Sequence, residues 1–138
     1  MSKGYVEFED EFGVLQRYRK HPNGRGMVAS SARVDATAFV DPTGYVDPGA
    51  RVGSRATIEH GAWIEPDAII GDRVIVGVGA RVGRGAQIGV GAIIGPYAVI
   101  GADSVVDAAA RVQRDTSVPA GARVRASRDD LRRFGLAA

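Results

Sequence analysis

The side chains best suited to chemistry in this 138-residue chain are its two histidines, His21 and His60. An imidazole ionises near neutral pH, so a histidine oriented by a carboxylate or a carbonyl can act as a general base toward a hydroxyl or an amine. His60 is the stronger candidate because Glu59 precedes it directly, whereas His21 begins a Pro-Asn-Gly turn. In the simpler interpretation, His60 is only an exposed polar residue at a turn.

Other reactive groups are scarce. The chain has no cysteine, which excludes disulfides and thiolate metal sites, and it shows no serine nucleophile beside a base. The pairs Asp41 and Glu59, and Asp47 and Glu65, are eighteen residues apart and could together hold a divalent ion. Solvated surface carboxylates near arginines are the more usual arrangement, so we expect no metal and no cofactor.

Basic residues gather near the end of the chain, although the net charge is only +2. Candidates for an anion-binding site are Arg123, Arg125, Arg128, Arg132 and Arg133. No aromatic residue is interleaved with these arginines, so a nucleic-acid partner is not expected. The alternative is a solvated, arginine-rich cap with no ligand.

A valine or isoleucine recurs at every sixth position from Val28 to Val124, and in nearly every case a small residue lies two positions before it. Side chains two apart on a strand point the same way, so both face the same side of a very short strand. Glycine, proline and aspartate crowd the remaining positions and favour corners. Residues 26–127 therefore predict seventeen consecutive strand-and-corner units, wound into a coil around a valine and isoleucine core.

Hexads such as 80–85 and 86–91 resemble those of the hexapeptide-repeat superfamily. The resemblance implies an all-β fold, a left-handed parallel β-helix of triangular section with three hexads in each coil. We expect an N-terminal β-hairpin cap or arm in residues 1–25 and the β-helix in residues 26–127. A short helix and tail should follow in residues 128–138, with Ser127 as N-cap and Phe134 against the last coil.

The residue before each core valine or isoleucine points outward, and the eighteen-residue period sorts these positions onto three faces. Several are apolar, which usually indicates a partner surface. The candidates for an oligomer interface are Phe39, Tyr45, Trp63, Ile69, Ile75, Ile93 and Val99. The resemblance implies a homotrimer with its prisms side by side; alternatively, the hairpin or the tail covers one of these ladders within the same chain.

The resemblance also implies an activity, since many hexapeptide-repeat proteins are acyltransferases that hold acyl-CoA in a groove between prisms. In this chain His60 would be the general base, with Glu59 beside it. Against acyl transfer, the hexads contain no insertion that could build a pocket. A second branch of the superfamily, the γ-class carbonic anhydrases, binds zinc with three histidines. The repeat of this chain has one histidine and cannot supply that set.

We therefore predict, first, a non-catalytic structural protein: a rigid trimeric β-helical prism that acts as a spacer or interaction module. The alternatives are an acyltransferase that uses acyl-CoA, and anionic-ligand binding through the arginine-rich end. Residues 19–24, which lead into the hexads, have a weaker resemblance to uncharacterised bacterial and bacteriophage repeat proteins. That similarity raises the option of a virion component in a larger protein assembly.

No segment has the apolar run of a signal peptide or the length of a membrane span. The default expectation is a soluble cytoplasmic protein without a membrane partner.

Overall fold

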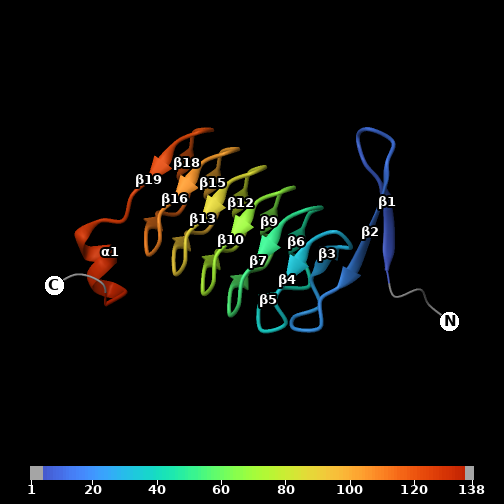
Figure 1. The fold of residues 1–138 in the computed structure, drawn as a ribbon, viewed down its shortest axis with the longest axis horizontal. Coiled ribbons are helices and arrows are strands. Elements are labelled where there is room, and N and C mark those ends of the chain that lie inside the picture. Colours follow the sequence, from blue (N-terminus) through green and yellow to red (C-terminus); the bar gives the residue numbers. More distant parts are fainter. Residues whose placement is uncertain (1–4, 136–138) are drawn as a thin grey trace.

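A computed structural model describes residues 5–135, so the predicted end segments 1–25 and 128–138 each extend beyond the described residues. The chain winds as a parallel β-helix whose coils stack along the long axis, with the hairpin β1–β2 at one end and α1 at the other (Figure 1). The predicted fold class, a left-handed parallel β-helix with an N-terminal hairpin and a short C-terminal helix, is confirmed.

Three sheets form the sides of the helix, and we name them sheets A, B and C. Sheet A contains β1 (Val6–Glu9), β2 (Leu15–Lys20), β3 (Met27–Ala29), β6 (Tyr45–Val46), β9 (Trp63–Ile64), β12 (Arg81–Val82), β15 (Val99–Ile100) and β18 (Ser117–Val118). Sheet B contains β4 (Arg33–Val34), β7 (Arg51–Val52), β10 (Ile69–Ile70), β13 (Gln87–Ile88), β16 (Val105–Val106) and β19 (Arg123–Val124). Sheet C contains β5 (Phe39–Val40), β8 (Thr57–Ile58), β11 (Ile75–Val76), β14 (Ile93–Ile94) and β17 (Arg111–Val112).

Each two-residue strand pairs in parallel with the strand eighteen residues later, as in Ile70 with Ile88. One residue of each strand points inward and the other outward, because side chains alternate along a strand. The inward valines and isoleucines are buried from Val40 to Val118, and the small residues two positions earlier pack beside them. The six-residue period therefore accounts for the core.

The last residue of most corners has a positive φ, as at Gly79, and its N–H donates to a carbonyl one coil earlier, here His60 O at 2.8 Å. The first coil differs. There Ser31, Thr37 and Thr43 occupy this position, and their side-chain hydroxyls, instead of a carbonyl, accept the N–H from the next coil. The hydroxyls thus take over a backbone role at the start of the β-helix.

The N-terminal hairpin packs against the first coil of the same chain. Strand β1 pairs antiparallel with β2, and β2 pairs antiparallel with β3, so the hairpin continues sheet A beyond the first coil. The turn after β2 covers the start of sheet C, where Val40 N donates to Asn23 O at 3.0 Å. His21 is buried in this turn, with Nε2 2.8 Å from Ala38 O, so it holds the turn in place.

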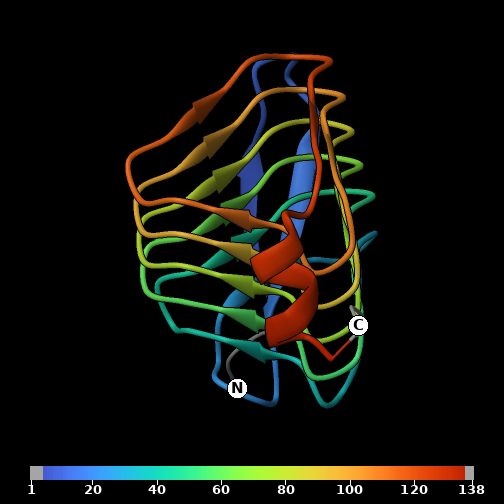
Figure 2. The same cartoon turned by 90° about the vertical axis from the view of Figure 1, so that its left-hand side faces the viewer.

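Helix α1 (Arg128–Arg133) begins at Ser127, whose hydroxyl accepts the Asp130 N–H in a capping box. The helix lies in front of the stacked coils in Figure 2. Phe134 packs against Gly91, where a Cβ would collide with its ring. The prediction that Phe134 lies against the last coil is wrong, because a hydrogen bond from Arg133 to Ala109 O, at 3.0 Å, holds the tail against earlier coils.

Adjacent residues of one strand should contribute unequally to the free energy of unfolding, because one side chain faces the core and the other faces outward. Ile69 and Ile70 test this expectation. Ile70 is 2 % exposed and packs in the interior ladder, whereas Ile69 on the same strand is 42 % exposed. Ile70→Ala should lower the free energy of unfolding by about 2–5 kcal/mol, because it leaves a cavity between coils. Ile69→Ala should change it by less than about 1 kcal/mol in the same urea titration. Equal losses would contradict the assigned inward and outward faces.

Candidate active site

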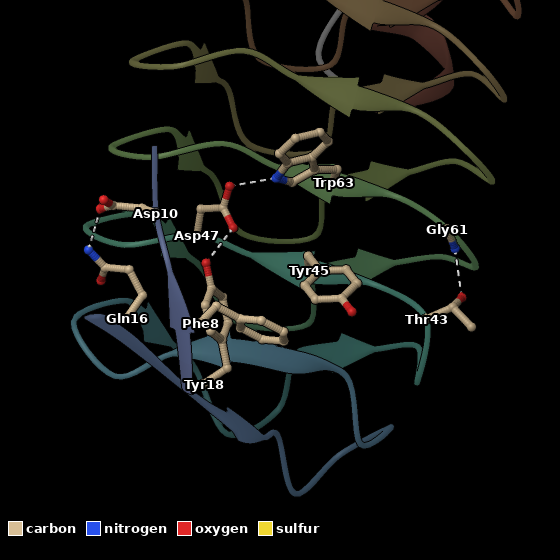
Figure 3. A pocket seen from close by; sticks show the side chains of 9 residues that line it. All are labelled: Phe8, Asp10, Gln16, Tyr18, Thr43, Tyr45, Asp47, Gly61 and Trp63. Atoms are coloured by element: carbon tan, nitrogen blue, oxygen red, sulfur yellow. Dashed lines mark hydrogen bonds between the residues drawn. The ribbon is translucent and has the colours of Figure 1, made fainter. Parts of the chain in front are cut away.

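A cavity of about 480 Å³ lies where the hairpin meets the first coils of sheet A (Figure 3). It is lined by Phe8, Asp10, Gln16, Tyr18, Thr43, Tyr45, Asp47, Gly61 and Trp63. The expectation that unbroken hexads leave no pocket within one chain is therefore wrong. The pocket-forming segment precedes the repeat, and it reaches the prism because β2 pairs with β3.

Aromatic rings form much of the cavity wall. Tyr45 and Trp63 are neighbours across one coil, because β6 and β9 pair in register. Tyr18 from the hairpin meets Tyr45 edge to face, with centroids 6.2 Å apart, and Phe8 meets Tyr18 in the same way at 5.4 Å. Tyr45 and Trp63, which the sequence offered as interface residues, thus line a cavity within the chain.

Asp47 joins the hairpin to the prism. Its carboxylate is buried and accepts hydrogen bonds from the Tyr18 hydroxyl at 3.0 Å and from Trp63 Nε1 at 2.5 Å (Figure 3). Burial raises the pKa of Asp47, while these two donors act in the opposite direction. Burial and the nearby Asp47 also raise the pKa of Tyr18. The expectation that Asp47 is a solvated surface acid is therefore wrong; the missed signal was the eighteen-residue spacing of Tyr45 and Trp63, which places two aromatic rings beside it.

His60 lies at the corner that borders this cavity. Its Nδ1 is 3.0 Å from Thr43 Oγ1 and 3.5 Å from Asp41 Oδ1. The Thr43 hydroxyl is 2.8 Å from Asp41 Oδ1, and it also accepts the N–H of Gly61 at 2.8 Å. Thr43 and Gly61 line the cavity, and His60 contacts Thr43, so the imidazole lies at the rim of the cavity.

These contacts select one tautomer of His60. Hydrogen bonds from Thr43 lower the pKa of Asp41, so Asp41 is an ionised acceptor at neutral pH. The single hydroxyl proton of Thr43 then points at Asp41, and Thr43 Oγ1 can only accept from His60. In a neutral imidazole this geometry favours the proton on Nδ1, which leaves the lone pair on Nε2, the nitrogen that a general base would use. The carboxylate that orients it is Asp41, one coil earlier, rather than the adjacent Glu59.

The remaining interface candidates lie on all three faces. Phe39, Ile75 and Ile93 project from sheet C, where Ile75 pairs with Ile93 across one coil. Ile69 lies on sheet B, and Val99 lies on sheet A beyond the cavity. Each of the five is at least partly exposed in the single chain.

Several candidate anion-binding arginines already have partners. Arg123 lies 3.0 Å from Asp107, and Arg132 lies 3.9 Å from Asp129. Arg133 donates to a backbone carbonyl. Arg125 and Arg128 are exposed near the start of α1.

Within residues 5–135, no three histidine, cysteine or acidic residues gather where they could hold a metal ion. No helix in this described part is long and apolar enough to cross a membrane.

Comparison with known proteins found no matching family model and no matching curated protein. Among solved structures, the acetyltransferase domain of PglB from Neisseria gonorrhoeae, in complex with acetyl coenzyme A, is similar. It is 19% identical, with a TM-score of 0.43, over 78% of this chain and 56% of that one. A hexapeptide transferase family protein from Anaplasma phagocytophilum is 19% identical over 71% of this chain and 73% of that one, with a TM-score of 0.47. The predicted resemblance to hexapeptide-repeat proteins agrees with the β-helical fold of these structures.

A third similar structure is a mutant of GDP-perosamine N-acetyltransferase from Caulobacter crescentus, in complex with CoA and GDP-perosamine. It is 28% identical, with a TM-score of 0.38, over 71% of this chain and 49% of that one. The chain thus spans about half the length of the PglB and perosamine structures.

The prediction of a non-catalytic structural or assembly protein is contradicted, because the similar solved structures are named as acetyltransferases and hexapeptide transferases. The virion location depended on that prediction and has no support. The physical error was to treat the prism as smooth. The hairpin gives it a cavity, and the first coil supplies Asp41 and Thr43 to orient His60.

The Asp47 network gives a titration test. Tyr18→Phe removes one hydrogen bond to the Asp47 carboxylate and keeps the ring that buries it, so the pKa of Asp47 should rise further. The loss should also destabilise the fold by about 1 kcal/mol. Carboxyl-carbon NMR titration measures the pKa, and Tyr97→Phe, on an exposed ring outside the cavity, is the control. An unchanged or lower pKa in the Tyr18 variant would show that the hydrogen bond is absent.

Proposed function

We propose that this chain is an acyltransferase that moves an acyl group from acyl-CoA to a hydroxyl or an amine, with His60 as the general base. The observation that carries this proposal is the Asp41–Thr43–His60 arrangement, which leaves the Nε2 lone pair free at the rim of a cavity. A base that is oriented by a carboxylate is the group that such a transfer requires.

One base is sufficient for both proton transfers of the reaction. His60 Nε2 removes the proton from the acceptor as its oxygen or nitrogen attacks the thioester carbonyl. The carbon–sulfur bond then breaks, the CoA thiolate leaves, and the proton on Nε2 passes to that thiolate. Asp41, 3.5 Å from Nδ1, stabilises the imidazolium that exists between the two proton transfers.

We propose a homotrimer with the prisms side by side, in which acyl-CoA occupies a groove between chains. The apolar side chains of sheet C support such an interface, since Phe39 and Ile75 are exposed and Ile75 pairs with the partly exposed Ile93. A cytoplasmic location and anionic-ligand binding at the arginine-rich end stay predictions.

The catalytic proposal predicts different results for two acidic neighbours of His60. His60→Ala should lower kcat for acyl transfer by about 10²- to 10⁴-fold, because the base is lost. Asp41→Asn should lower kcat about tenfold or more, since it removes the charge that orients the imidazole. Glu59→Gln should keep activity within about twofold, because Asp41 is the carboxylate facing His60.

The assay measures CoA release from acetyl-CoA with a panel of amine and hydroxyl acceptors. Circular dichroism establishes that each variant is folded. Full activity in His60→Ala, or a larger loss in Glu59→Gln than in Asp41→Asn, would contradict the proposed role of this corner.

The trimer proposal predicts a sedimentation result. Ile75→Glu places a charge in the apolar ladder of sheet C and should convert the assembly to monomers, because a buried unpaired charge is costly. Gln113→Glu adds the same charge at an exposed corner and should leave the mass unchanged. A wild-type chain that sediments as a monomer at every concentration would rule out the trimer.

A further inference from the structure

We propose that the cavity between the hairpin and sheet A binds an organic cation, of the alkylammonium class. The wall combines four aromatic rings with two carboxylates, which is the composition of a cation-binding aromatic cage. This inference goes beyond the acyltransferase proposal, because no step of the binding requires His60 or acyl-CoA.

The rings come from two separate elements that converge on one space. Phe8 and Tyr18 are supplied by the hairpin, and Tyr45 and Trp63 by adjacent coils (Figure 3). A cation within about 6 Å of such a ring is attracted by the ring quadrupole. The chain already shows this at the same indole, where the Arg81 guanidinium lies 4.2 Å from the Trp63 ring centroid.

The charge of the cavity also favours a cation. Its lining includes Asp10 and Asp47 but no lysine, arginine or histidine. The nearby Arg81 is paired with Glu65, so it adds little net positive charge.

The two carboxylates differ in environment, since burial raises the pKa of Asp47 and hydrogen bonds lower that of Asp10. Asp10 accepts hydrogen bonds from Gln16 and from the N–H groups of Phe12 and Val14, which lower its pKa. Asp47 accepts from a tyrosine hydroxyl and an indole N–H, and both donors are neutral. Neutral donors satisfy a carboxylate without cancelling its charge, so a cation in the cavity would gain from both acids.

The size of the cavity limits the ligand. About 480 Å³ accommodates a small ammonium compound such as choline. An anion of the same size would face two carboxylates, and a neutral isostere would gain only from burial of apolar surface. The site should therefore bind a cation more tightly than a neutral molecule of the same shape, and this difference distinguishes it from a simple apolar pocket.

The fluorescence of Trp63 tests the proposal directly, since it is the only tryptophan in the chain. Choline should change this emission in a saturable way, and calorimetry on the full chain should give the same dissociation constant. The neutral isostere 3,3-dimethylbutan-1-ol should bind at least about tenfold more weakly, because it lacks the charge.

Matched variants locate the site. Tyr45→Leu removes one wall of the cavity and should weaken choline binding about tenfold, whereas Tyr97→Leu, at an exposed ring outside it, should not change the affinity. Asp10→Asn should weaken binding as well, since one of the two negative charges is lost. His60→Ala should bind choline like the wild type, which separates this proposal from the catalytic one.

Three results would overturn the proposal. They are the absence of saturable choline binding up to 100 mM by both methods, equal affinities for choline and its neutral isostere, and wild-type affinity in a folded Tyr45→Leu variant. If the wild-type chain binds choline but shows no acyl transfer, only the proposed acyltransferase function would be overturned.

Discussion

The whole molecule depends on one constraint, the hydrogen bonding of each coil to the coil eighteen residues away. A parallel strand has no partner within its own hexad, so its N–H and C=O groups must be satisfied by the neighbouring coils. That pairing fixes which residues stack, as in Tyr45 on Trp63 and Ile70 on Ile88. An insertion or deletion of one residue inside the repeat would move every later side chain out of this register.

The candidate active site is a direct consequence of this stacking at one corner. Thr43 occupies the last position of its corner, and its hydroxyl accepts the Gly61 N–H, whereas in later coils the equivalent N–H donates to the carbonyl of the preceding corner residue, as Gly79 N does to His60 O. The same hydroxyl then lies between Asp41 and His60. A structural hydrogen bond between coils and the orientation of a candidate base therefore share one atom, Thr43 Oγ1.

The hairpin gives a repetitive prism a local and distinct surface. It is bound through the β2–β3 ladder and through the buried Asp47, which links Tyr18 to Trp63. Burial of this carboxylate costs free energy, and its two donors offset only part of that cost. Such an arrangement at the junction of two elements is typical of binding sites more than of structural caps.

The sequence by itself determined the fold class, the three faces and the inward ladder, because a six-residue period with corner residues is compatible with few other structures. It also identified His60, Tyr45 and Trp63 as residues of interest. It could not identify Asp41 and Thr43 as the partners of His60, since side-chain contact across a coil depends on corner conformation as well as on period. It also failed for Asp47 and the cavity. Only the tertiary structure decided how the non-repeating residues 5–25 fold back, because the antiparallel pairing of β2 with β3 follows no period.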